Sequence, residues 1–125
     1  MSAIGPEQIA SLLRRYAACI SAGDKQGIVA LYAADATAEI PVGGPVHRGI
    51  DAIRKFYVGN ELAERVEITG PICIAGNEAA APMRARIARP DGVVEIDVID
   101  VVEVDASGRF KKLRAFFDLQ GARRV

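Results

Sequence analysis

The second half of the chain is dominated by three long strand-like stretches, joined by turns too short to hold a helix. Parallel strands need a crossover of a dozen or more residues, so short connections join antiparallel neighbours. The sequence therefore predicts an antiparallel meander, preceded by a further strand, Glu67–Ile74, that ends at the turn residues Gly76-Asn77. The three stretches are Glu78–Arg89, Val93–Val104 and Arg109–Leu119, with Pro90-Asp91-Gly92 and Asp105-Ala106-Ser107-Gly108 between them.

The first half is patterned mainly as helices. Apolar residues recur at helical spacing from Ile9 to Ile20, after a Gly5-Pro6 start that suits a helix N-terminus. A short strand, Ala36–Ile40, and a loop of Pro and Gly residues separate the later helices. Helices followed by strands indicate an α+β fold. The first expected helix opens at Gly5-Pro6 and stops at Ser21-Ala22-Gly23. The second runs from Lys25 to about Ala33 after an Asp24 cap, and the third from an Asp51 cap through Phe56 and Tyr57.

Length, charge and hydropathy exclude several classes of protein. A chain of 125 residues predicts one domain, residues 1–125, and 16 basic against 16 acidic residues argue against a nucleic-acid-binding module. No stretch has the form of a signal peptide or the length of a membrane span, which predicts a soluble cytoplasmic protein without a membrane partner. Cys19 and Cys73 are expected to be two buried thiols. The chain ends, Met1–Ile4 and Gly121–Val125, are expected to be loose.

One carboxyl group interrupts an apolar strand face. In Val93–Val104, strand alternation puts Asp100 on a face with aliphatic neighbours, whereas Asp97 belongs to the more polar face. A buried carboxylate without partners is so unfavourable that the group tends to stay protonated, and a protonated acid donates hydrogen bonds. Two interpretations stay open: a functional acid, or a buried Asp100 paired with an arginine.

All three tyrosines, Tyr16, Tyr32 and Tyr57, fall on the apolar sides of expected helices. Each could be a core aromatic residue whose hydroxyl finds a partner. Beside a buried acid, a tyrosine hydroxyl could instead help to stabilise an oxyanion.

The strand faces around Asp100 are rich in small residues. Such faces favour a ligand cavity between sheet and helices, although ordinary packing stays open. His47 has no second His or Cys nearby and is expected to face solvent, and Gly43-Gly44-Pro45 lacks the residues of a phosphate loop. The faces carry Ala79, Ala81, Met83, Ala85 and Ile87 on one strand, and Leu113, Ala115, Phe117 and Leu119 on another.

Taken together, the sequence resembles the bacterial ketosteroid isomerases of the nuclear transport factor two-like, or SnoaL-like, superfamily, from Arg14 to about Phe117. The matching residues are Arg15-Tyr16, Gly23-Asp24, Ile28-Val29, Tyr32-Ala33, Asp35-Ala36-Thr37, Glu39, Pro41, Gly43, Gly49, Ile53, Phe56-Tyr57, Thr69-Gly70-Pro71 and Asp97-Val98-Ile99-Asp100-Val101. The resemblance implies a cone-shaped α+β barrel, with a curved, mostly antiparallel sheet and three N-terminal helices over its concave face. It also implies a homodimer that associates through the sheet.

The resemblance assigns roles to individual residues. Tyr16 and a protonated Asp100 fall on the family's oxyanion hole, and Tyr57 and Tyr32 on the hydrogen-bond network behind it. The implied ligand is a small hydrophobic, steroid-like ketone or phenol, and the implied reaction moves a C=C bond through a dienolate without cofactor or metal. The expected substrate-binding residues are Met83, Phe117, Val98 and Phe56.

The chain departs from the family at the general base, because Ile40 occupies the position of the proton-transferring Asp. Glu39 is adjacent, but strand alternation points it to the opposite face. Three interpretations follow: an isomerase that is slow or that uses Glu39 or a water; acid-assisted dehydration, cyclisation or epoxide opening; or a non-catalytic pocket for a steroid or phenol.

Overall fold

The computed structural model describes residues 4–125, which form three α-helices and an eight-stranded sheet. The helices are α1 (Pro6–Ser21), α2 (Lys25–Val29) and α3 (Ile50–Gly59), and a short 3₁₀ helix, η1, spans Leu119–Gly121. The strands are β1 (Tyr32–Glu39), β2 (Val46–Arg48), β3 (Arg65–Ile68), β4 (Cys73–Ala75), β5 (Glu78–Arg89), β6 (Gly92–Val104), β7 (Phe110–Phe116) and β8 (Arg123–Arg124). None of the helices described is long and apolar enough to cross a membrane.

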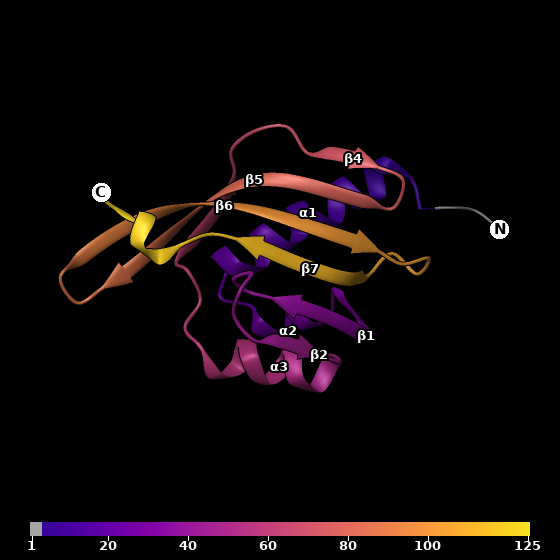
Figure 1. Ribbon diagram of the computed structural model, residues 1–125, viewed down its shortest axis with the longest axis horizontal. Helices are drawn as coiled ribbons and strands as arrows, with labels where there is room; N and C mark the ends of the chain where they lie inside the picture. Colours follow the sequence, from indigo (N-terminus) through magenta and orange to yellow (C-terminus); the bar gives the residue numbers. More distant parts are fainter. Residues whose placement is uncertain (1–3) are drawn as a thin grey trace.

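The sheet has the strand order β2-β1-β7-β6-β5-β3, with β4 paired to β5 and β8 to β6. All pairs are antiparallel except β1 with β7. In the described chain the order ends at β2 and β3, so the curved sheet stays open. Figure 1 shows α1 crossing behind β5, β6 and β7, and α3 below β1 and β2. The expected α+β fold and its antiparallel meander, β5-β6-β7, are confirmed.

Four predicted elements have wrong boundaries. The strands predicted as Ala36–Ile40 and Arg109–Leu119 run from Tyr32 to Glu39 and from Phe110 to Phe116, and Leu119 belongs to η1. The second helix ends at Val29, because the chain has joined the sheet by Leu31 and Tyr32. Tyr32 of β1 pairs with Phe110 of β7, and the Phe110 amide donates to the Leu31 carbonyl at 2.8 Å. Tyr32 is therefore a strand residue. The predicted strand Glu67–Ile74 is interrupted after Ile68 and resumes at Cys73. The gap contains Pro71, which has no amide hydrogen for a sheet ladder.

Two strands had no clear sequence signal. β2 lies in the segment predicted as a Pro/Gly loop, and β8 lies in the chain end expected to be loose, where it pairs with Val94 and Glu95. The expectation for Met1–Ile4 falls outside the described residues except at Ile4. Helix α3 begins after Gly49, whose φ of 85° suits glycine, so Asp51 lies in the first turn and is not the cap.

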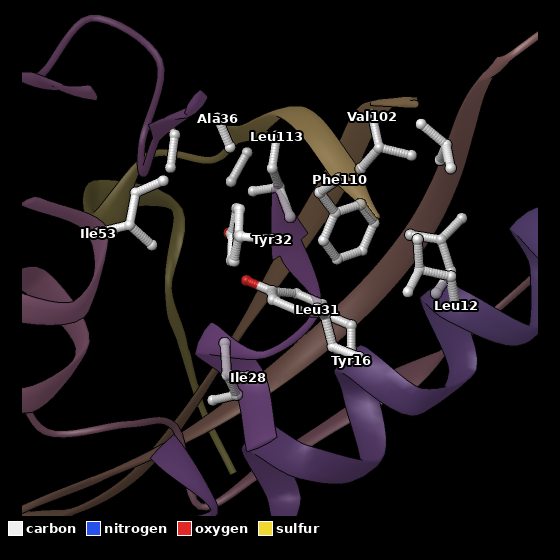
Figure 2. Close-up of a cluster of buried hydrophobic side chains, with 14 of the residues drawn as sticks. Leu12, Tyr16, Ile28, Leu31, Tyr32, Ala36, Ile53, Val102, Phe110 and Leu113 are labelled. Carbon is white, nitrogen blue, oxygen red and sulfur yellow. The ribbon is translucent and has the colours of Figure 1, made fainter. Parts of the chain in front are cut away.

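The core lies between α1 and the sheet. Figure 2 shows Phe110 of β7 among Tyr16, Tyr32, Val102 and Leu113. The Phe110 side chain is fully buried, and its ring meets the Tyr16 ring edge-on at 5.6 Å between centroids. The prediction of two buried thiols is wrong: Cys19 is half-buried and Cys73 is exposed at the sheet edge in β4.

Candidate functional site

A cavity of about 420 Å³ opens between α1, α3 and the concave face of the sheet. This volume is within the range of small-molecule sites. The lining is largely apolar and comes from both helices, four strands and the segments that follow β1, α3 and β7. The lining residues are Tyr16, Ile20, Ile40, Pro41, Phe56, Tyr57, Asn60, Glu61, Leu62, Ala63, Glu64, Val66, Met83, Ala85, Ile87, Ala88, Ile96, Val98, Asp100, Ala115, Phe117 and Leu119.

Asp100 is the buried carboxyl of this cavity. It is 3% exposed and lies on β6 between Ala81 of β5 and Ala115 of β7. Ala115 also lines the cavity, so its small methyl side chain leaves space in front of the carboxyl group. Within residues 4–125 the Asp100 side chain makes no hydrogen bond and no ion pair, so the alternative of an arginine partner does not hold for the described chain. Because no fully buried side-chain oxygen of the described residues lacks a partner, the Asp100 oxygens open onto the cavity. Burial raises the pKa of Asp100 to about 7, and below that pH the group is mostly a neutral donor.

The three tyrosine hydroxyls form one chain. The Tyr16 and Tyr57 oxygens are 3.0 Å apart, and the Tyr57 and Tyr32 oxygens 2.7 Å apart. Tyr16 and Tyr57 line the cavity, whereas Tyr32 lies behind them. Burial raises the pKa of all three phenols, and the nearby Asp100 charge raises each further. At neutral pH the phenols are therefore protonated donors.

The apolar residues singled out from the sequence also line the cavity. Met83 and Val98 are direct neighbours on β5 and β6, and Phe117 follows β7. Phe56 packs edge-on against Tyr57 at 5.1 Å. On its other side lies His47, with the ring centroids 4.5 Å apart. His47 is half-buried by this contact, which corrects the expectation of a solvent-facing side chain.

No carboxylate occupies the position that the resemblance assigns to the general base. Ile40 lines the cavity, and Pro41 lies beside it. Glu39 does not line it, because its side chain turns away and accepts a hydrogen bond from Arg114 Nε at 3.0 Å. Asp118 does not line it either, and its carboxylate accepts the amide hydrogen of Gln120 at the start of η1.

Sequence reasoning missed three polar residues of the lining. Asn60, Glu61 and Glu64 come from the segment between α3 and β3 and are largely exposed. This segment has no periodicity, so nothing in the sequence pointed it toward the cavity. Among the described residues no group of three His, Cys, Asp or Glu side chains is placed to hold a metal ion. Chemically, the deep end offers neutral oxygen donors to a ligand oxygen, and apolar walls strengthen such bonds.

Comparisons with known proteins agree with this geometry. The SnoaL-like domain matches residues 13–113. A steroid Delta-isomerase from Nocardioides simplex is 34% identical over 111 residues, which cover 88% of this chain and 89% of that protein. A solved structure of the epoxide hydrolase/cyclase-like enzyme SalBIII, with a role in pyran ring formation in polyether salinomycin, matches with a TM-score of 0.85 and 25% identity. That match covers 95% of this chain and 97% of the other. The chain belongs to the SnoaL-like domain family.

Proposed function

We propose that this protein is an isomerase of the steroid Delta-isomerase type, which binds a flat apolar ketone in the cavity and stabilises its dienolate. The observation that carries the proposal is the placement of Asp100. A carboxyl group that is 3% exposed, without a partner in the described chain, opens into an apolar cavity shared with the Tyr16 hydroxyl. A carboxyl group with a raised pKa that faces an apolar cavity is a candidate for a functional role, because its neutral form can donate a hydrogen bond to a ligand oxygen.

In the proposed reaction the ketone oxygen accepts hydrogen bonds from Tyr16 and from neutral Asp100. A proton leaves the carbon between the C=O and C=C groups, and the electron pair of that C–H bond moves toward oxygen to give the dienolate. A proton then returns two carbons away, so the product is an isomer of the substrate and no redox partner is required. Tyr57 orients the Tyr16 hydroxyl through the 3.0 Å hydrogen bond, and Tyr32 supports Tyr57 at 2.7 Å.

In this proposal a water molecule in the cavity carries the proton. Ile40 cannot transfer one, and the ion pair of Glu39 with Arg114 holds that carboxylate away from the cavity. Water is a weaker base than a carboxylate, so turnover should be slow. A positioned general base contributes about 10²–10⁴-fold to the rate of such reactions.

The test follows the conversion of a 5-ene-3-ketosteroid to its conjugated isomer by ultraviolet absorbance. We expect slow turnover by the wild type and a rate about 10²–10⁴-fold higher for Ile40→Asp. Ile40→Asn is the matched control, because the Asn side chain is polar and has the size of Asp but cannot act as a base. This variant should turn over at the wild-type rate. If neither the wild type nor Ile40→Asp turns over, the isomerase proposal is wrong.

A second candidate is acid-assisted cyclisation or epoxide opening, with Tyr16 and Asp100 as donors. Two observations favour it: the structural similarity to the epoxide hydrolase/cyclase-like enzyme, and the aliphatic residue at position 40. This candidate gains if the wild type does not isomerise the steroid but opens an epoxide that carries a nearby hydroxyl. Asp100→Asn should then slow ring opening, because the amide cannot deliver a proton.

The proposed partner besides the ligand is a second copy of the chain, bound through the outer face of the sheet. Ile99 and Phe116 are neighbours on that face and are 50% and 41% exposed. Light scattering should give a dimer mass, and Ile99→Asp should shift it toward the monomer. The cytoplasmic location expected from the sequence stays a prediction.

A further inference from the structure

The inner faces of β5 and β6 form a long apolar floor of the cavity, which starts at Asp100. Successive side chains on one face of a strand are two residues apart, and the lining residues follow this period along both strands. They are Val98 and Ile96 on β6, and Met83, Ala85 and Ile87 on β5. All of these side chains are apolar, so the floor continues as hydrocarbon well past the acid.

The strand register gives the length of this floor. Asp100 lies opposite Ala81 on β5, and Ile87 is six residues further along the same strand, which corresponds to about 20 Å. The exposed polar lining residues lie at the cavity mouth, in the segment between α3 and β3, and not on the sheet: Asn60, Glu61 and Glu64. A ligand whose oxygen binds Asp100 can therefore extend over about 20 Å of apolar sheet.

The C-terminal segment supplies a second wall at the far end of the floor. β7 pairs with β6 as far as Phe116, opposite Ile99, and β8 pairs with β6 again where Arg123 lies opposite Glu95. The residues between β7 and β8 therefore run beside β6, which extends past the end of β7 toward the C-terminus (Figure 1). Leu119 of η1 lies in this stretch, lines the cavity and is 53% exposed. The fold thus holds an exposed leucine beside the apolar floor.

We propose that Ile87 and Leu119 form a subsite for a hydrocarbon tail on the ligand. Ile87 is half-buried and Leu119 is largely exposed, so a tail that covers them removes apolar surface of both partners from water. The subsite is continuous with the cavity, so its occupant is the far end of the same ligand. This inference rests on the proposed function, because the oxygen bound at Asp100 fixes where the tail lies. It adds the class of substrate: an elongated ring compound with the reacting oxygen at one end and a saturated hydrocarbon substituent at the other.

The test uses two phenolic steroids with the same ring body, which differ only at the end remote from the phenol. One compound carries hydrogen there and the other a butyl group. Titration calorimetry should give the butyl compound a Kd roughly 10- to 100-fold lower, because each buried CH₂ group strengthens binding by about threefold. The double variant Ile87→Thr/Leu119→Asn presents polar side chains of similar size to the tail. It should reduce the difference to about threefold and leave the Kd of the hydrogen compound unchanged.

Val58→Asn is the matched control, because Val58 is an exposed aliphatic residue that does not line the cavity. This variant should keep the full difference between the two compounds. The inference is overturned if the double variant also keeps the full difference, or if it weakens the binding of both compounds equally. Equal Kd values of the two compounds for the wild type, both raised by Asp100→Leu, would overturn this inference and leave the proposed function standing. Binding of neither compound would overturn both.

Discussion

The two faces of β6 shift the pKa of a carboxyl group in opposite directions. Asp97 and Asp100 are three residues apart on one strand, so their side chains point to opposite sides of the sheet. On the outer face, Arg123 and Arg84 bind the Asp97 carboxylate and lower its pKa. On the inner face, burial without a partner raises the pKa of Asp100 to about 7.

The difference shows that the neighbouring strands, and not the strand itself, decide what a carboxyl group does here. Asp97 has Arg84 as its neighbour on β5, whereas Asp100 has Ala81 there and Ala115 on β7. Long cationic neighbours make an ion pair at the surface, and short apolar neighbours leave a space in which the acid stays neutral.

The largest expected effect is on the pH dependence of stability. The raised pKa of Asp100 means that the folded state binds this proton more tightly than the unfolded chain. Its stabilisation is therefore complete below about pH 4 and is lost as the pH rises from about 4 to about 7. The difference between the pKa of Asp100 in the unfolded chain and its folded value of about 7 corresponds to a change of roughly 4 kcal/mol in the free energy of unfolding over this pH range. Urea unfolding should show the difference between Asp100→Asn and wild type growing in favour of the variant over that range.

Asp97→Asn is the control for this measurement, and its difference from wild type should run the other way. Because ion pairs lower the pKa of Asp97, its contribution is present at neutral pH and is lost as the pH falls through the lowered pKa. Parallel pH profiles for wild type and Asp100→Asn would mean that Asp100 is not held neutral by the fold.

The second prediction concerns ligand affinity. Asp100→Leu should raise the Kd of a phenolic steroid by about 10- to 100-fold at pH 6, because a hydrogen bond from the acid to the ligand oxygen is lost. Asp97→Leu should leave the Kd unchanged. A fluorescence titration measures both. Equal Kd values for Asp100→Leu and wild type would remove Asp100 from the binding site.

The third prediction concerns the tyrosine chain on the inner face. Tyr57→Phe removes the middle hydroxyl and both of its hydrogen bonds, so the hydroxyls of Tyr16 and Tyr32 lose their partner. We expect a loss of about 1–3 kcal/mol in the free energy of unfolding. Tyr32→Phe removes only the terminal hydroxyl and should cost less. If the two variants are equally stable, the three tyrosine hydroxyls do not form a connected hydrogen-bond network.

The smallest expected effect is on the outer face. Arg84→Gln removes one of the two arginine partners of Asp97, and that pair is exposed to solvent. Exposed ion pairs contribute little and are screened by salt. Thermal unfolding should therefore give a Tm close to that of wild type. The difference should be smaller still in about 1 M salt, because the Debye length is then only roughly 3 Å. A loss as large as that of Tyr57→Phe would break the contrast between the two faces.

Much of this contrast could be predicted from the sequence, because it depends on local alternation. Short turns fix β5, β6 and β7 as neighbours, and the two-residue period separates Asp97 from Asp100. The segment around Tyr32 could not be placed in the same way. Its strand is defined by parallel pairing with β7, which lies more than 70 residues further along the chain, and no local pattern encodes such a partner.

The residues of the candidate site also fall into two groups, those that the sequence pattern could place and those that it could not. Residues on long regular elements, such as Tyr16, Met83 and Asp100, could be assigned to the inner face from periodicity alone. Glu61 and Glu64 lie in an irregular segment, whose path is fixed by contacts with distant residues. One such contact is the hydrogen bond from the Glu64 amide to Arg86. Their position at the cavity mouth therefore emerged only from the folded structure.

Ala115, one of the two alanines beside Asp100, has a consequence for how such a site can persist. Ala115 lines the cavity next to the acid, so a larger aliphatic side chain at this position would occupy part of the space in front of the carboxyl group. Such a replacement would add buried apolar contacts while blocking the ligand. Stability and ligand binding therefore make opposite demands on this one residue.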